Sequence, residues 1–140
     1  MSVFEMEKAE IWVNDMRDAL QIADEDRAWL ALRAGLHALR DRLTVDEAAH
    51  LAAQMPMMIR GLFFEGWHPG GKRRRLRSRE SFLEDIEREL QHGQIDAEKV
   101  ARATFHLLDE HVTAGMVTNV RHSLPRKLAD LWAEPIALPN

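Results

Sequence analysis

The second half of the chain repeats the first, and this repetition limits the folds that the sequence can adopt. Adding 69 to the residue numbers from 31 to 66 lays that segment on residues 100–135 without a gap, and upstream an offset of 70 aligns the apolar positions of the two halves. The matched pairs include Arg33 with Arg102, Ala34 with Ala103, His37 with His106, Leu39 with Leu108, Thr44 with Thr113, Pro56 with Pro125 and Leu62 with Leu131, and further upstream Trp12, Val13, Met16 and Leu20 with Phe82, Leu83, Ile86 and Leu90. A unit of ~60 residues would be marginally stable alone. We therefore expect two similar units that pack on each other about an approximate two-fold axis.

Both units have the sequence pattern of α-helices. Apolar residues such as Leu36, Leu39 and Leu43 recur three and four positions apart, which places them on one face of a helix. The segment TVDE, which starts at Thr44, has the pattern of a capping box and predicts the start of a further helix. Pro56 blocks a helical hydrogen bond, so the third helix of the unit should kink or restart there.

These patterns predict an all-α helical bundle that forms a single domain over residues 1–140. Unit one covers residues 7–66, a basic linker covers residues 67–78, and unit two covers residues 79–135. Each unit has three main helices, so the bundle has six, or eight if the segments after Pro56 and Pro125 count separately. The few helix-disfavouring residues, with 7 Gly, 5 Pro and no Tyr in 140 residues, agree with this interpretation.

Several stretches resemble one known family. The segment LHALRDRLTVDEAAHLAAQMPMMIRGLFFEGW, from Leu36 to Trp67, is followed by a basic linker, by SRESFL and later by SLPRKL. Together they resemble the bacterial domain-of-unknown-function family 2267 over nearly the whole chain. The resemblance implies a small, soluble, all-helical bacterial protein with no established activity, and it supplies no catalytic residues.

A basic segment joins the two units of this otherwise acidic chain. Six of the 19 Lys and Arg residues lie within residues 72–79, and the formal net charge changes from −4 to −10 when they are set aside. We expect a solvated linker, because the remaining surface repels polyanions. The alternative is a weak nucleic-acid site, in which these cations contact phosphates and two aromatic rings stack on unpaired bases. Its residues would be Trp67, His68, Lys72, Arg73, Arg74, Arg75, Arg77 and Arg79.

Two repeat-related histidines each precede a carboxylate by four positions. His37 with Asp41 and His106 with Glu110 can each form a hydrogen bond along one helix face. If the two-fold axis brings the pairs together, two His and two carboxylates would form a metal site inside the bundle. We favour a structural role over this metal site, because duplication alone copies a histidine twice; a pH-sensitive interface is a third interpretation.

Apolar residues gather around Pro56 and beyond it. Met57, Met58, Phe64 and Trp67 either fill the core or form a contact surface, because methionine adapts to both environments. As a contact surface they would bind a protein partner of unknown identity, and a homodimer is one form that this contact can take. We therefore expect a non-catalytic protein-interaction or stress-associated accessory protein.

Other functions lack sequence support. The chain has no cysteine and no GxGxxG, P-loop, GxSxG or HExxH pattern, so we predict no catalytic residues, no cofactor and no enzymatic activity. The amino end lacks the basic and apolar regions of a signal peptide, and no apolar run reaches the ~20 residues that cross a bilayer. The sequence therefore predicts a cytoplasmic protein without membrane contact.

Overall fold

The computed structural model describes residues 2–69, 77–91 and 95–133, and in these residues the chain forms eight α-helices and no strands. The helices are α1 (Val3–Leu20), α2 (Glu25–Arg40), α3 (Val45–Ala52), α4 (Met57–Phe64), α5 (Arg79–Leu90), α6 (Ala97–His111), α7 (Ala114–Ser123) and α8 (Arg126–Ala133). The predicted all-α fold is confirmed. Among the described helices, none is long and apolar enough to cross a membrane.

Polar side chains and prolines set the helix boundaries, as the sequence indicates. Thr44 caps α3 as predicted: its hydroxyl accepts the Glu47 amide at 3.1 Å, and the Glu47 carboxylate accepts the Thr44 amide at 2.7 Å. Ser78 caps α5 through the Ser81 amide at 3.1 Å. Helix α3 ends at Ala52, and the chain starts a new helix after Pro56, which occupies the N-cap of α4.

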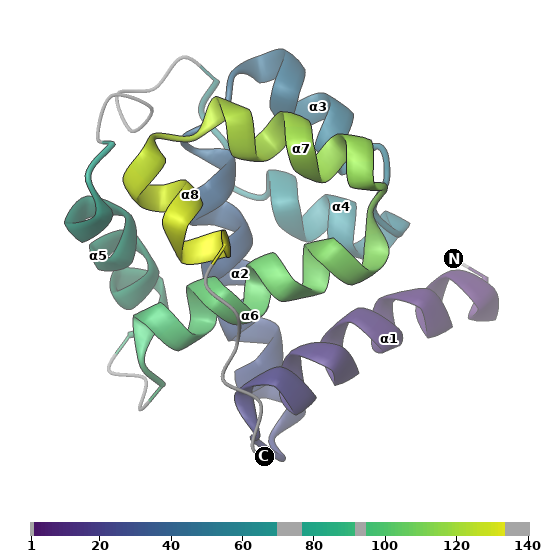
Figure 1. The fold of residues 1–140 in the computed structure, drawn as a ribbon. Coiled ribbons are helices and arrows are strands. Elements are labelled where there is room, and N and C mark those ends of the chain that lie inside the picture. Colours follow the sequence, from purple (N-terminus) through teal and green to yellow (C-terminus); the bar gives the residue numbers. More distant parts are fainter. Residues whose placement is uncertain (1, 70–76, 92–94, 134–140) are drawn as a thin grey trace.

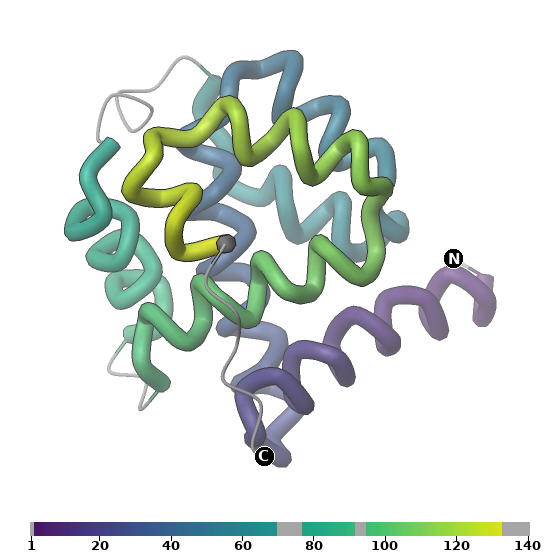
Figure 2. Tube along the Cα trace, viewed as in Figure 1, coloured from purple at the N-terminus to yellow at the C-terminus, as the bar shows by residue number. Residues whose placement is uncertain are grey.

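Helix α2 lies at the centre of the molecule, and helices of both halves surround it. It contacts α1, α4, α5 and α6, and its turns from Ala34 to Arg40 are buried on every side. In Figures 1 and 2, α6 crosses α2, while α3 and α7 lie side by side at one end of the bundle. The contacting pairs also include α1 with α6, α5 with α6, α1 with α4, α5 with α8 and α6 with α8.

The core is one apolar cluster that draws residues from every described helix. Aromatic rings from three helices stack in sequence: Phe82 lies 6.0 Å from Phe105, and Phe105 lies 4.6 Å from Trp132, measured between ring centroids. Met55, Ile59 and Phe63 belong to the core. Apolar contacts that link the two halves therefore hold the fold together.

The amino-terminal half of α1 differs from the rest of the bundle because it projects away from it (Figure 1). Only Ala9, Trp12, Val13 and Met16 of this helix are buried. The first two turns therefore leave the bundle, while the later turns pack on α2, α4 and α6.

Candidate functional site

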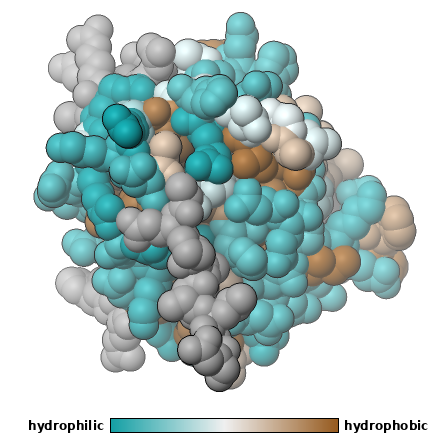
Figure 3. All heavy atoms as spheres, in the orientation of Figure 1, coloured by the Kyte–Doolittle hydropathy of each residue, from teal (hydrophilic) through white to brown (hydrophobic). Residues whose placement is uncertain are grey.

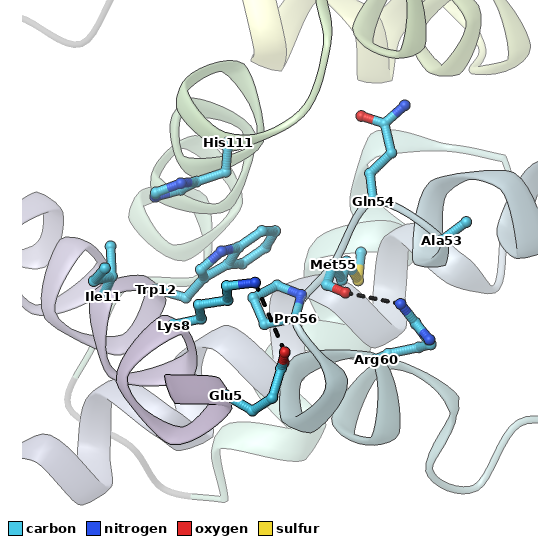
Figure 4. A pocket seen from close by; sticks show the side chains of 10 residues that line it. All are labelled: Glu5, Lys8, Ile11, Trp12, Ala53, Gln54, Met55, Pro56, Arg60 and His111. Carbon is cyan, nitrogen blue, oxygen red and sulfur yellow. Dashed lines mark hydrogen bonds and ion pairs between the residues drawn. The ribbon is translucent and has the colours of Figure 1, made fainter. Parts of the chain in front are cut away.

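A groove runs between α1 and the turn that joins α3 to α4. Its volume is about 350 Å³, and it is lined by Glu5, Lys8, Ile11, Trp12, Ala53, Gln54, Met55, Pro56, Arg60 and His111. Figure 4 shows the Trp12 ring below the His111 ring, with the Lys8 side chain extending beside Pro56. Its lining combines the buried apolar residues Trp12 and Met55 with the charged residues Glu5, Lys8 and Arg60, so the groove can accept an apolar side chain that has charged neighbours.

The projecting turns of α1 place large apolar side chains in solvent. Val3 is 71% exposed, Phe4 64% and Met6 48%. These side chains form the projecting end, which appears as apolar atoms at the tip of α1 in Figure 3. The Lys8 ammonium lies 4.4 Å from the centroid of the Phe4 ring, so the projecting end continues the edge of the groove. Neighbouring apolar side chains in solvent are typical of a contact surface.

Of the four apolar residues that the sequence indicates as a contact surface near Pro56, two are exposed and two are half-buried. Met57 and Met58 are exposed at the start of α4. Phe64 and Trp67 are half-buried, with ring centroids 5.1 Å apart, so Trp67 covers the end of α4. The two methionines are thus available to a partner, whereas the two aromatic residues pack on each other and against the core.

Helices α1 and α6 meet through a polar contact between Asp15 and His111. The Nε2 atom of His111 lies 2.6 Å from a carboxylate oxygen of Asp15, and the His111 ring stacks on Trp12 with centroids 5.0 Å apart. Glu110 lies beside them, and one of its carboxylate oxygens lies 2.8 Å from Nε2 of His106. In the part of the chain that the structure describes, the one group of three close metal-ligating side chains is Asp15, Glu110 and His111, with ligand atoms within 4.8 Å of one another.

His37 is placed differently from His106, the residue with which the predicted repeat aligns it. Its ring is buried, with Nδ1 2.7 Å from a carboxylate oxygen of Glu89 and Nε2 2.7 Å from the carbonyl oxygen of Leu62. Asp41 instead accepts a hydrogen bond from Arg40 Nε at 2.8 Å. Both nitrogens of His37 are therefore engaged, and the structure does not bring His37 and Asp41 into a ligand group with His106 and Glu110.

The described cations of the basic segment, residues 72–79, are held by protein groups. Arg77 donates to the carbonyl oxygen of Ser123 at 2.9 Å, and Arg79 donates to Glu98 at 2.5 Å. His68 is exposed. Four cations of the nucleic-acid hypothesis lie outside the described residues, and they are Lys72, Arg73, Arg74 and Arg75.

Arginines shift the pKa of two carboxyl groups. A hydrogen bond from Arg33, at 3.0 Å, and the charge of its guanidinium lower the pKa of Glu65. A hydrogen bond from Arg102, at 2.6 Å, lowers the pKa of Glu98 despite partial burial, and Arg79 adds to the effect. Both carboxylates therefore stay ionised at neutral pH and act as structural ion-pair partners.

A second groove, of about 320 Å³, lies between α3 and α7. It is lined by Glu47, His50, Met116, Asn119, Val120, His122 and Ser123. The Glu47 carboxylate accepts from both the Thr44 amide and the Ser123 hydroxyl. Because both contacts serve the α3 cap and the α3–α7 contact, Glu47 has a structural role here.

Sequence reasoning missed Asp15 and His111 as site residues. They lie 96 positions apart, and neither belongs to a known short motif. A signal did exist in the repeat, because the offsets of 70 and 69 place Asp15 on Asp85 and His111 on Arg42. Those two equivalents form a buried ion pair at 2.5 Å, so the aligned positions make related contacts in both halves.

Comparison with known proteins agrees with the resemblance seen in the sequence. No curated protein matches the chain. A family model described as "Uncharacterized conserved protein (DUF2267)" matches residues 9–131, which include all of α2 to α7 and most of α1 and α8. The match covers far more than half of the 140 residues, and the chain therefore belongs to the DUF2267 family.

Proposed function

We propose that this protein is a non-catalytic protein-interaction or accessory protein, whose contact surface is the projecting end of α1 together with the groove beside it. The observation that carries this proposal is the exposure of Val3 and Phe4, at 71% and 64%, on turns that leave the bundle. Exposed apolar side chains that gather in one patch are typical of a protein interaction surface. The cytoplasmic location predicted from the sequence stays a prediction.

We also propose that the two halves are tandem repeats related by a pseudo-two-fold axis. If α1–α4 are exchanged with α5–α8, the contact of α1 with α6 becomes that of α5 with α2, and the contact of α1 with α4 becomes that of α5 with α8; all four pairs occur. Repeat-related residues also meet where α2 crosses α6, because Gly35 faces Thr104, 69 positions later. A residue meets its own equivalent only near such an axis, so this contact supports the proposed symmetry.

The polar contacts of the two halves support the same relation. The Asp15–His111 pair corresponds to the Asp85–Arg42 pair, and the stacking of Trp12 on His111 corresponds to the Arg42 guanidinium over the Phe82 ring, 5.5 Å from its centroid. We accordingly keep the boundaries of unit one at residues 7–66, the linker at residues 67–78 and unit two at residues 79–135.

The occupant we propose for the groove is the projecting end of a second copy of this chain. The projecting end lies on α1, and α1 also forms one side of the groove. Two copies of the chain related by a two-fold axis can therefore each insert the projecting end into the groove of the other copy. Glu7 is exposed beside the projecting end, and the groove that it would meet holds the cations Lys8 and Arg60 together with Glu5, which lies 3.7 Å from Lys8. Steering by these charges and burial of Phe4 would act together in such a dimer.

Sedimentation velocity over a concentration series tests this proposal. We expect the sedimentation coefficient to rise with concentration for the wild type and to stay at the monomer value for a Phe4→Glu variant. Val45→Glu is the matched control, because Val45 is an exposed apolar residue, 49% accessible, at the start of α3. A wild type that stays monomeric at every concentration, or a Val45→Glu variant that dissociates equally, would overturn the proposed dimer.

The nucleic-acid alternative has less support, because two of its six cations within residues 72–79, Arg77 and Arg79, bind protein groups. Salt-dependent anisotropy of labelled DNA and RNA tests it directly. Binding that is lost when Arg73, Arg74, Arg75 and Arg77 are changed to Ala would favour this alternative.

A further inference from the structure

The contact between α1 and α6 contains the ligand group Asp15, Glu110 and His111. Asp15 and His111 are partly buried, with side-chain exposures of 31% and 21%, and Glu110 is more open at 45%. The His111 ring is fixed by its stacking on Trp12, which is itself buried. The group therefore combines one oriented imidazole with two carboxylates contributed by two helices.

The equivalent position in the other half of the molecule shows what this group lacks. There, Asp85 pairs with Arg42 at 2.5 Å, and Asp41, the equivalent of Glu110, pairs with Arg40 at 2.8 Å. Each carboxylate thus contacts a guanidinium, and Asp85 contacts a second one, that of Arg88, at 2.9 Å. In the α1–α6 contact, His111 replaces Arg42 and Asp109 replaces Arg40. The two carboxylates remain, but two permanent positive charges have been exchanged for an imidazole and a further acid.

We propose that Asp15, Glu110 and His111 bind a divalent transition-metal cation of the Zn²⁺ class, which supplies the charge that Arg42 and Arg40 supply in the other half. This inference depends on the repeat relation proposed above and not on the proposed dimer. One imidazole nitrogen and two carboxylate oxygens form a ligand set that suits Zn²⁺ and leaves a coordination position for water. The site also lies at the carboxyl end of α6, where the helix dipole favours a cation.

His106 has a supporting role in this arrangement. Its Nε2 atom lies 2.8 Å from one oxygen of Glu110, which leaves the second oxygen of that carboxylate for the metal. Such an outer contact orients a ligand and commonly adds to metal affinity. His106 and Glu110 were metal candidates in the sequence, and the structure groups Glu110 with Asp15 and His111 instead of with His37.

Isothermal titration of the untagged full chain with Zn²⁺, after treatment with chelator, tests the site. We expect one ion per chain, and we expect no saturable uptake of Mg²⁺ under the same conditions, because Mg²⁺ prefers more oxygen ligands. A Glu110→Gln variant should weaken Zn²⁺ binding by about tenfold or more. Since Glu110 is exposed, this variant should keep the helical circular dichroism of the wild type.

A His111→Arg variant is the sharper test because it copies the Arg42 arrangement. Arginine in this place should preserve the pairing with Asp15 and the fold, and it should abolish Zn²⁺ uptake. His50→Ala and His122→Ala are the controls, because these exposed histidines line the other groove and should leave binding unchanged. Absence of saturable uptake by the wild type, or equal uptake by His111→Arg, would overturn the proposal. Self-association is measured in chelator, so the two proposals can fail separately.

Discussion

At the scale of single residues, the contact between Gly35 and Thr104 determines how closely the two central helices approach. A Cβ atom added to Gly35 would lie 2.1 Å from the Thr104 hydroxyl oxygen. That hydroxyl is buried and donates to the Val100 carbonyl oxygen at 2.8 Å, so it cannot easily move aside. Glycine is therefore required at this position by space and not by backbone conformation.

We predict that Gly35→Ala lowers the free energy of unfolding by about 1–3 kcal/mol, because α2 and α6 must separate to admit the methyl group. Urea denaturation followed by circular dichroism measures the change. Gly61→Ala is the matched control: it also lies within a helix, but the added Cβ meets no atom within 4 Å. The control should be neutral or stabilising by up to about 1 kcal/mol. Equal urea midpoints for the two variants would contradict the close approach.

At the scale of helices, an ion-pair network ties the start of α5 to the first turn of α6. Glu98 accepts hydrogen bonds from Arg79 on α5, at 2.5 Å, and from Arg102 one turn later on α6, at 2.6 Å. Its place in the first turn of α6 also suits a negative charge, because the helix dipole is positive there. Glu98 therefore connects the first turn of α6 to the start of α5, the helix that follows the linker.

We predict that this network contributes stability at neutral pH and loses it in acid. Arg102 and Arg79 lower the pKa of Glu98 in the folded state. The contribution is therefore fully present above the ordinary glutamate pKa of about 4.3 and disappears as the pH falls through the lower folded-state pKa. The Glu98 side chain is 36% exposed, so solvent screens its ion pairs and we expect less than about 1 kcal/mol.

Urea midpoints of the wild type and of Glu98→Gln, measured from neutral to acidic pH, check this prediction. The difference between the two proteins should be largest at neutral pH and should vanish in acid. Glu80→Gln is the control for an exposed acid in the first turn of α5. A difference that grows as the pH falls would contradict the assigned sign.

At the scale of the whole molecule, each of the two central helices packs against helices of both halves. Helix α2 contacts α5 and α6 of the second half, and α6 contacts α1 and α2 of the first. The core cluster is likewise continuous across the halves. Neither half therefore buries its apolar face without the other.

We predict that the chain unfolds in one cooperative transition, because separating the halves would expose both central helices. Unfolding is followed by far-ultraviolet circular dichroism, which reports all helices, and by tryptophan fluorescence, at a concentration that keeps the chain monomeric. In a Trp132→Phe variant the remaining tryptophans, at positions 12, 29 and 67, lie in unit one and at the start of the linker, and Trp12 also reports its contact with His111 of the second half. Its two curves should coincide, and separate fluorescence and dichroism transitions would show that the halves unfold independently.

The sequence by itself determined the all-α class, the family and most helix boundaries. These features depend on neighbouring residues: the Thr44 cap needs only Glu47 three positions later, and Pro56 interrupts a helix through its own ring. The sequence also predicts the proposed repeat, because a duplication would preserve apolar spacing. The His106–Glu110 contact could be predicted for the same reason, since four positions span one helical turn.

Only the tertiary structure decided which distant side chains meet and which surfaces stay open. His37 contacts Glu89, 52 positions away, and not Asp41, because the partners of a buried ring are the groups on the helices packed around it. His111 met Asp15 across 96 positions, and the first turns of α1 extended past the bundle. Local patterns determine helices because hydrogen bonds within a helix join near neighbours, whereas the groove and the ligand group depend on how those helices pack.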